Sequence, residues 1–151
     1  PRSRTTGAYG AVFGVFLSQK VNNMPLTIVG NGKQTRDFIH VKDLVSALIL
    51  AIKKSKPGEI YNIGYGKETS VNKIAKLIGG KKTYIPKRPG ERQRSLSNIQ
   101  KVKKHLNWSP KISIDEGVAM LLKDINKWKN APKWTPKKIS KATAVWFKYL
   151  K

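Results

Sequence analysis

The six arginines of this chain are its residues best suited to binding a phosphate group, because a planar guanidinium can donate two parallel N–H bonds to it. They lie in three short segments, whereas the 25 lysines are spread along the whole sequence. A lysine is a point charge and cannot provide this geometry, so the pattern indicates ligand-binding positions; chance clustering and surface ion pairs are the alternatives. The six are Arg2, Arg4, Arg36, Arg88, Arg92 and Arg94.

Arg36 stands in the most distinctive stretch of the sequence. Two glycines at 30 and 32 predict a tight turn, and residues 35–40 then alternate like a short strand. Asp43 opens the apolar helical pattern that follows, as expected near a helix N-terminus. The sequence therefore predicts an arginine at the corner between a turn and a strand, where its guanidinium can reach a phosphate.

Short strands and helices must position these arginines. Several helix starts are indicated by capping residues: Ser70, Thr135 before a proline, and the capping boxes Ser97–Gln100 and Ser113–Glu116. We expect Trp128 and Trp146 to pack helices rather than stack on nucleic-acid bases. One face of the last helix is predicted to be lined by Ile139, Ala142, Trp146, Tyr149 and Leu150. The predicted helices are 11–21, 41–54, 71–78, 98–106, 114–128 and 136–150, and the predicted strands are 26–29, 35–40, 60–63 and 83–85.

The composition fits one soluble domain, which we expect to be cytoplasmic. A chain of 151 residues can bury a core, it has no cysteine, and it has no apolar run long enough to span a bilayer. The net charge of +23 suggests a polyanionic partner, but basic residues exceed acidic ones in every third of the sequence. No single tail or patch can therefore be assigned to such a partner.

No complete catalytic arrangement occurs in the sequence. Neither Gly-x-Gly-x-x-Gly nor Tyr-x-x-x-Lys is present. The two histidines, His40 and His105, have no second ligand at metal spacing, and the eight carboxylates are scattered. We therefore predict neither a catalytic group nor a metal site in this chain.

Five segments, taken in order, resemble one family. Pro1-Arg2 is similar to the end of a Tyr-Gly-Pro-Arg segment, 26–40 to a Gly-Asp-Gly-x-Gln-x-Arg-Asp-Phe-Ile-His strand and turn, and 60–64 to a Tyr-Asn-Ile-Gly strand. Residues 88–91 are similar to Arg-x-Gly-Asp, and 100–117 to Lys-x-x-Leu-Gly-Trp-x-Pro with its following helix. Together they resemble the C-terminal half of the extended short-chain dehydrogenases, the NAD-dependent nucleotide-sugar epimerases and dehydratases. The match reaches about residue 122, and 134–150 resembles a tail of some members.

The resemblance implies an α/β, α+β-like fragment: a small C-terminal substrate-binding domain over residues 1–151 with short strands and about six helices. It also implies that the N-terminal Rossmann domain, with its NAD and its catalytic tyrosine and lysine, lies upstream. A chain that begins at Pro1 without a methionine is expected to be such a fragment. Residues 41–64 would then be a helix and strand that complete the sheet of the cofactor domain, and NAD would be bound by the parent enzyme and not by this fragment.

The resemblance further implies a nucleoside-diphosphate sugar as ligand, carrying UDP, dTDP or GDP, in an enzyme of the sugar 4-epimerase type. Arg36 and Arg88 match the two arginines that the family places on the diphosphate. Glu91 matches the carboxylate on the ribose, where many members have aspartate. The residues expected beside the base are Phe13, Thr27, Ile28 and Val29, and those expected to face the sugar are Arg2 and Tyr9.

Two other classes of function stay open. A basic nucleic-acid-binding module would explain the charge and the four tryptophans, but the sequence has no recognised motif of that kind. A ligand-free interaction domain would explain the apolar core alone. Without a cofactor domain, the apolar faces of 11–21 and 60–63 also lead us to expect that the isolated chain self-associates.

Overall fold

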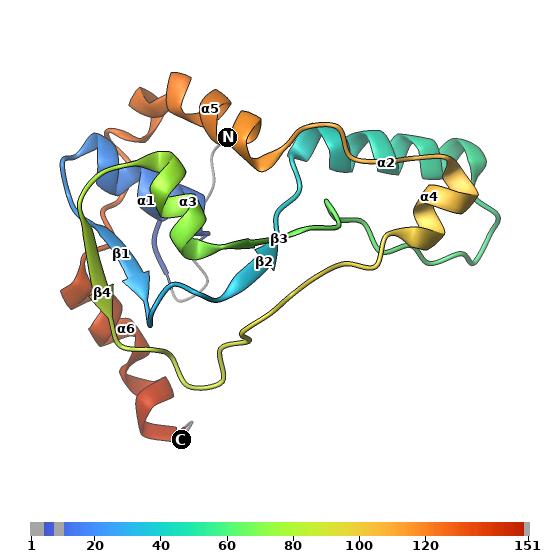
Figure 1. Cartoon of the computed structure of the whole chain (residues 1–151). Helices are drawn as coiled ribbons and strands as arrows, with labels where there is room; N and C mark the ends of the chain where they lie inside the picture. Colours follow the sequence, from blue (N-terminus) through green and yellow to red (C-terminus); the bar gives the residue numbers. More distant parts are fainter. Residues whose placement is uncertain (1–4, 8–10, 150–151) are drawn as a thin grey trace. The chain divides into compact units, whose positions relative to one another are not determined.

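The computed structural model describes residues 5–7 and 11–149, and the chain divides into two compact units (Figure 1). The first unit comprises residues 1–34, 70–93 and 118–151, and the second comprises 35–69 and 94–117. Each unit is therefore assembled from segments distant in sequence. In the described part of the chain the fold has six α-helices, one 3-10 helix and four short strands. This agrees with the predicted α/β fragment.

The first unit is built on a two-stranded parallel sheet. Strand β1 (Leu26–Val29) pairs with β4 (Lys82–Ile85), with Leu26 opposite Lys82 and Val29 opposite Ile85. Helix α1 (Val12–Val21) packs against β1, against α3 (Val71–Ile78) and against the 3-10 helix η1 (Ile125–Trp128). The middle of α1 is buried, which is typical of a helix that is apolar on all sides. The unit also contains α6 (Pro136–Tyr149), and α5 (Ile114–Lys123) begins in the second unit and ends in the first.

A buried glutamine ties three parts of the first unit together. The amide nitrogen of Gln19 donates to Thr27 Oγ1 at 2.8 Å and to the carbonyl of Trp134 at 2.9 Å. Its amide oxygen accepts the N–H of Thr27 at 3.1 Å. Because every polar atom of this side chain has a partner, its burial is not penalised. Gln19 thus fixes α1 and β1 against the segment that leads into α6.

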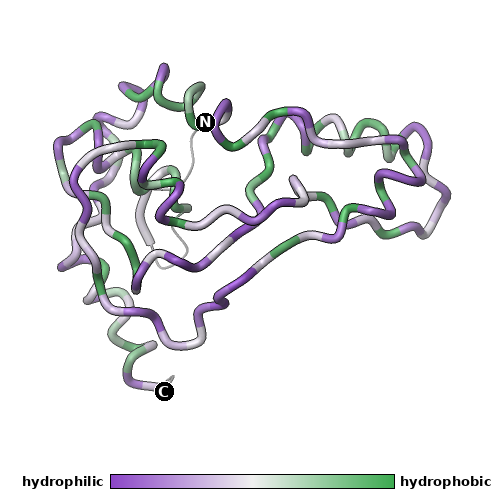
Figure 2. Tube along the Cα trace, viewed as in Figure 1, coloured by the Kyte–Doolittle hydropathy of each residue, from purple (hydrophilic) through white to green (hydrophobic). Residues whose placement is uncertain are grey.

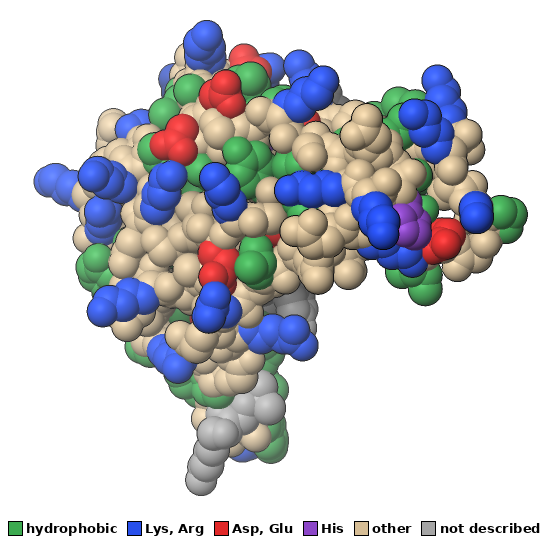
Figure 3. Space-filling view, turned by 45° about the vertical axis from the view of Figure 1, so that its right-hand side comes forward, with side chains coloured by type: hydrophobic (Ala, Val, Ile, Leu, Met, Phe, Trp, Pro, Cys, Tyr) green, Lys and Arg blue, Asp and Glu red, His purple; other side chains and the backbone are tan. Residues whose placement is uncertain are grey.

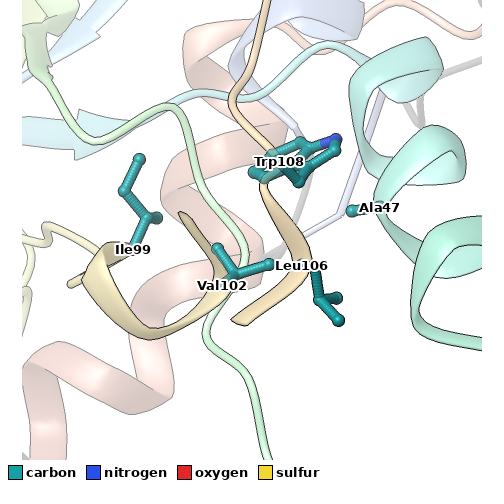
Figure 4. Packing of buried hydrophobic residues seen from close by; sticks show 5 residues of the cluster. All are labelled: Ala47, Ile99, Val102, Leu106 and Trp108. Atoms are coloured by element: carbon teal, nitrogen blue, oxygen red, sulfur yellow. The ribbon is translucent and has the colours of Figure 1, made fainter. Parts of the chain in front are cut away.

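The second unit has a small hydrophobic core between α2 (Val41–Lys54) and α4 (Gln100–Leu106). It also contains β2 (Thr35–Asp37) and its partner strand β3 (Glu68–Ser70), whose last residue belongs to the first unit. Buried carboxylate Asp43 accepts the backbone N–H groups of Lys111 and Ile112, so it joins the start of α2 to the segment before α5. Figure 4 shows the core cluster, which consists of Ala47, Ile99, Val102, Leu106 and Trp108.

One face of α2 is apolar and exposed within its unit. Hydrophobic residues run along this helix (Figure 2), and Ile52 is 86% exposed. The exposed members are Val41, Val45, Leu48, Ile49 and Ile52. We call these five residues the α2 apolar face. An exposed apolar stripe of this kind is typical of a surface that packs against another protein part.

Most predicted helix starts are confirmed. The hydroxyl of Ser70 accepts the N–H of Lys73 at 3.1 Å, and that of Thr135 accepts the N–H of Lys138 at 3.3 Å. The capping box is present at residues 113 and 116, where the Glu116 carboxylate accepts the N–H of Ser113 at 2.8 Å and the Ser113 hydroxyl accepts the N–H of Glu116 at 3.2 Å. Local capping chemistry therefore sets these boundaries.

Four predictions of local structure were wrong. Residues 60–63 form no strand, because a strand needs a hydrogen-bonded neighbour and the sheets of the described chain pair only β1 with β4 and β2 with β3. The strand predicted over 35–40 ends at Asp37, whose carboxylate binds a loop instead. Helix α4 starts at Gln100, not at residue 98. Helix α5 ends at Lys123, and the 3-10 helix follows.

The capping prediction at Ser97 and the predicted face of the last helix also need correction. The Asn98 side chain accepts the N–H of Gln100, while the backbone N–H of Ser97 binds Asp37. In α6 the buried residues are Ile139 and Thr143, and the Thr143 hydroxyl donates to the carbonyl of residue 139. Ala142 and Tyr149 are exposed, Trp146 is half-buried, and Leu150 lies outside the described residues.

Candidate functional site

The loop that follows β4 lies beside helix α6 of the same unit (Figure 1). Arg88 belongs to this loop and lines a pocket together with residues of α6. Its side chain is half-buried, and its guanidinium carbon stands 5.8 Å from the centroid of the Trp146 ring. This distance is within the range of a cation–π interaction. The predicted phosphate-binding arginine is thus in contact with the C-terminal helix, a contact that the sequence interpretation did not include. Since Trp146 follows the buried Ile139 by seven residues, helical periodicity places both on one face.

Arg88 also lines a pocket of about 310 Å³. The walls are mainly apolar, with Ile85 and Pro86 on one side and Ile139 and Phe147 of α6 on the other. Among the described residues, the charged ones that line the pocket are Arg88 and Lys137, and none is Asp or Glu. A pocket with apolar walls and two cations is suited to a ligand with an anionic group and an apolar or aromatic part.

Glu91 and Phe13 are half-buried residues of the first unit. The backbone N–H of Glu91 approaches the carbonyl of Arg88 at 3.4 Å, and Gly90 between them has φ +70°. The two residues predicted to bind diphosphate and ribose therefore belong to one tight turn. Phe13 lies in the first turn of α1.

The strand expected beside the base is largely covered. Thr27 and Ile28 are buried, with Ile28 fully so. Alternate residues of a strand direct their backbone groups to opposite edges, so Thr27 and Val29 face away from β4. On that edge the side chain of Gln19 binds Thr27, and the amide of Gln34 donates to the carbonyl of Val29 at 2.9 Å. Val29, at the end of this strand, is half-buried and is its least covered residue.

Arg36 lies in β2 of the second unit, where its side chain is half-buried and Nη1 donates to the carbonyl of Thr35 at 2.8 Å. The next residue, Asp37, organises its surroundings. One carboxylate oxygen accepts the N–H of Tyr65 at 2.8 Å, and the other accepts those of Gly66 at 3.0 Å and Ser97 at 3.2 Å. Three backbone donors on one carboxylate fix the strand that carries Arg36.

Arg94 has a different role from the one suggested by the arginine pattern. Its Nη2 and Nε donate to the two carboxylate oxygens of Glu68, at 2.6 and 2.9 Å. Arg94, together with the hydroxyl of Thr35, lowers the pKa of Glu68 to about 2. For Arg94 the alternative of a surface ion pair is therefore correct. Glu68 was not singled out in the sequence, because nothing local to residue 68 predicts a partner 26 positions away.

The glycine turn after β1 does not fit a dinucleotide. Gly32 has φ +69°, and a Cβ at this position would meet the side chains of Asn72 and Ile28. The turn also leads to a strand rather than to a helix N-terminus, so it lacks the arrangement that binds a pyrophosphate in a dinucleotide fold.

The remaining expectations concern the sugar-facing residues, a metal site, a membrane span and the distribution of charge. Arg2 and Tyr9 lie outside the described residues. Among residues 5–7 and 11–149, no three His, Asp or Glu side chains gather to hold a metal ion, and no helix is long and apolar enough to cross a membrane. Lysine and arginine side chains are distributed over the face in Figure 3, with few acidic ones among them. The visible charge is spread rather than concentrated in one patch.

Comparison with known proteins gives a consistent result. Residues 2–121 match the family model described as GDP-mannose 4,6 dehydratase. The chain is 37% identical, over 113 residues, to a putative UDP-glucose 4-epimerase from Methanocaldococcus jannaschii, covering 71% of this chain and 36% of the relative. The structure resembles that of the Thermotoga maritima UDP-glucose 4-epimerase with UDP-glucose, with a TM-score of 0.77 and 32% identity, covering 84% of this chain and 42% of the other.

A third relative is the UDP-glucuronic acid 4-epimerase from Bacillus cereus, whose structure contains UDP-glucuronic acid and NAD. Its TM-score is 0.71 at 29% identity, with 78% of this chain and 40% of that chain covered. The chain thus spans about two fifths of the length of these relatives, in their C-terminal part. Because the family model covers most of the chain, the chain belongs to the extended short-chain dehydrogenase family of NAD-dependent sugar-nucleotide epimerases and dehydratases.

Proposed function

We propose that this chain is the nucleotide-sugar-binding part of an NAD-dependent epimerase or dehydratase, of the sugar 4-epimerase type. Family membership over residues 2–121 carries the proposal. It is supported by the epimerase relatives, two of which have solved structures with UDP-glucose or UDP-glucuronic acid. The ligand of this chain would be a UDP, dTDP or GDP sugar.

Arg36 and Arg88 each bind the diphosphate in this proposal. The diphosphate carries the negative charge of such a ligand, and bidentate guanidinium contacts would set its register. Support for Arg88 comes from its pocket, where the charged lining residues that the structure describes are the cations Arg88 and Lys137. Support for Arg36 comes from the three hydrogen bonds that fix the neighbouring Asp37 and hence the strand.

The ribose, the base and the sugar of the ligand contact other residues in this proposal. Glu91, one turn from Arg88, accepts hydrogen bonds from the ribose hydroxyls. The base lies near Phe13 and the strand 27–29, chiefly at its Val29 end, since Thr27 and Ile28 are buried. Arg2 and Tyr9, which lie outside the described residues, would contact the sugar in this proposal. Anchoring the nucleotide in this way would orient the reacting sugar carbon at a distance from the binding contacts.

Chemistry at the sugar belongs, in this proposal, to a cofactor domain that the 151 residues do not include. Residues 1–151 form the C-terminal substrate-binding domain, and 41–64 pack against the cofactor domain. The sheet of that domain would give residues 60–63 the hydrogen-bonded neighbour that they lack among the described residues. The α2 apolar face supports this arrangement, because a soluble surface rarely leaves five large aliphatic residues of one helix exposed. NAD would bind to that domain and not to the glycine turn after β1.

Calorimetric titration of the chain with UDP, dTDP and GDP tests the proposal. Arg36→Ala and Arg88→Ala should each weaken binding of the preferred nucleotide by about 2–5 kcal/mol, because a desolvated phosphate loses its charged partner. Lys87→Ala, which removes an exposed cation next to Arg88, is the matched control and should change the affinity by less than about 1 kcal/mol. Unchanged affinity in both arginine variants, with melting temperatures like the native chain, would overturn the assignment.

A further inference from the structure

We infer that Trp146 is a positioning residue: its ring holds the Arg88 guanidinium in the orientation that receives the ligand phosphate. The inference rests on the proposed role of Arg88 and concerns a residue in α6, beyond the segment 2–121 that matches the family model. It starts from one contact, the 5.8 Å approach of the guanidinium carbon to the indole ring.

The contact is compatible with phosphate binding by the same side chain. Stacking on an aromatic ring uses the face of a guanidinium, whereas a phosphate is bound by the N–H groups along its edge. An arginine side chain has several rotatable bonds, and ordering it on ligand binding costs conformational entropy. A ring that already holds the guanidinium reduces this cost, so Trp146 should raise the affinity without touching the ligand.

The surroundings of the pair favour a strong contact. Arg88 and Trp146 are both half-buried, and the pocket beside them has apolar walls formed by Ile85, Ile139 and Phe147. Cation–π contacts are stronger where water is partly excluded. Helix α6 is itself held in place, because Ile139 and Thr143 are buried and the residue before its cap, Trp134, accepts a hydrogen bond from Gln19. The ring is thus presented from a fixed element.

The experiment compares substitutions of Trp146 in the full 151-residue chain, titrated with the preferred nucleoside diphosphate. Trp146→Leu keeps an apolar side chain but removes the ring face, and should weaken binding about three- to tenfold. Trp146→Phe keeps a ring and should restore most of the affinity. The matched control is Tyr149→Leu, which breaks a second cation–π contact on the same helix, with Lys148 at 5.1 Å, away from the pocket lining. This variant should bind like the native chain.

A double-mutant cycle separates positioning from general loss of structure. In an Arg88→Ala background, Trp146→Leu should change the affinity by less than about twofold, because the residue that it positions is absent. An equal loss in both backgrounds would overturn the inference. Native affinity in Trp146→Leu alongside weakened Arg88→Ala would also overturn it, while leaving the proposed function intact. If the native chain bound no nucleoside diphosphate, the proposed function and the role of Trp146 would both be wrong.

A spectroscopic measurement on the native chain avoids reliance on a variant that unfolds. A guanidinium held over an indole ring experiences its ring current, so the side-chain NMR signals of Arg88 should be shifted upfield from those of exposed Arg92. The shift should disappear in Trp146→Leu. Signals of Arg88 at the positions of an exposed arginine in the native chain would contradict the contact on which the inference rests.

Discussion

Replacing Asp37 by asparagine tests the hydrogen-bond arrangement that fixes the strand of Arg36. The native carboxylate accepts three backbone N–H groups, those of Tyr65, Gly66 and Ser97, at 2.8 to 3.2 Å. Asparagine has almost the same shape, but only one of its two terminal atoms accepts hydrogen bonds. The substitution therefore changes the hydrogen bonding with little change in packing.

The free-energy cost of Asp37→Asn follows from the three hydrogen bonds that the carboxylate accepts. In the amide orientation that costs less free energy, the amide oxygen stays near Gly66 and Ser97. The hydrogen bonds from these two N–H groups then have a neutral acceptor in place of a charged one, which costs about 1 kcal/mol each. Its NH₂ group then faces the N–H of Tyr65, and an unsatisfied donor costs about 1–3 kcal/mol. Because Asp37 is half-buried and water can relieve part of this, we expect a total loss of about 2–4 kcal/mol in the second unit.

Amide hydrogen exchange followed by NMR measures this loss where it occurs. In Asp37→Asn, exchange at Tyr65, Gly66 and Ser97 should accelerate by about 30- to 900-fold, which is the conversion of 2–4 kcal/mol. Asp124→Asn is the control, because its carboxylate pairs with the exposed neighbour Lys127 at 2.6 Å, and it should leave these amides unchanged. Native exchange rates at the three amides in Asp37→Asn would refute the reasoning.

Three further predictions concern stability and association. Arg94 lowers the pKa of Glu68 to about 2, so the stabilisation by this ion pair is present above pH about 4.5 and is lost as the pH falls through about 2. The unfolding free energies of the native chain and of Glu68→Gln should therefore converge as the pH falls over this interval. A difference that stays constant would contradict the ion pair's contribution. Gly32→Ala should destabilise the chain by about 1–3 kcal/mol more than Gly58→Ala in denaturant titrations, because both have positive φ but only the first Cβ meets side chains; equal losses would contradict the packing argument. Ile52→Lys on the α2 apolar face should reduce self-association in light scattering without lowering the melting temperature, and a native chain that is monomeric at high concentration would refute self-association.

Local signals in the sequence were sufficient for most of the helices. The cap at Ser70 and the box at Ser113 and Glu116 were predicted because a capping residue and its partner are three positions apart. The box predicted at Ser97 failed because a carboxylate 60 positions away, that of Asp37, binds the backbone of this residue. Long-range hydrogen bonds of this kind leave no periodic pattern in the sequence.

The same distinction applies to the candidate site. Residue type and loop position were enough to single out the six arginines as phosphate-binding candidates, and the family resemblance then selected Arg36 and Arg88. Residue type and loop position did not separate Arg88 from Arg94. Only the fold brings Glu68 to Arg94 and Trp146 to Arg88. A strand at 60–63 was predicted from β-propensity, which describes a side chain's fit to a sheet and not the presence of a neighbouring strand.

The central claim is that this chain binds a nucleoside diphosphate, and ligand-induced stabilisation tests it most directly. The melting temperature should be measured with UDP, dTDP and GDP, with the corresponding nucleosides, and with a short DNA duplex, in one buffer at two salt concentrations. We predict that one diphosphate raises the melting temperature while its nucleoside does not, because the arginines bind the phosphates. No shift with any of the three diphosphates, or a larger and strongly salt-dependent shift with DNA, would contradict the account.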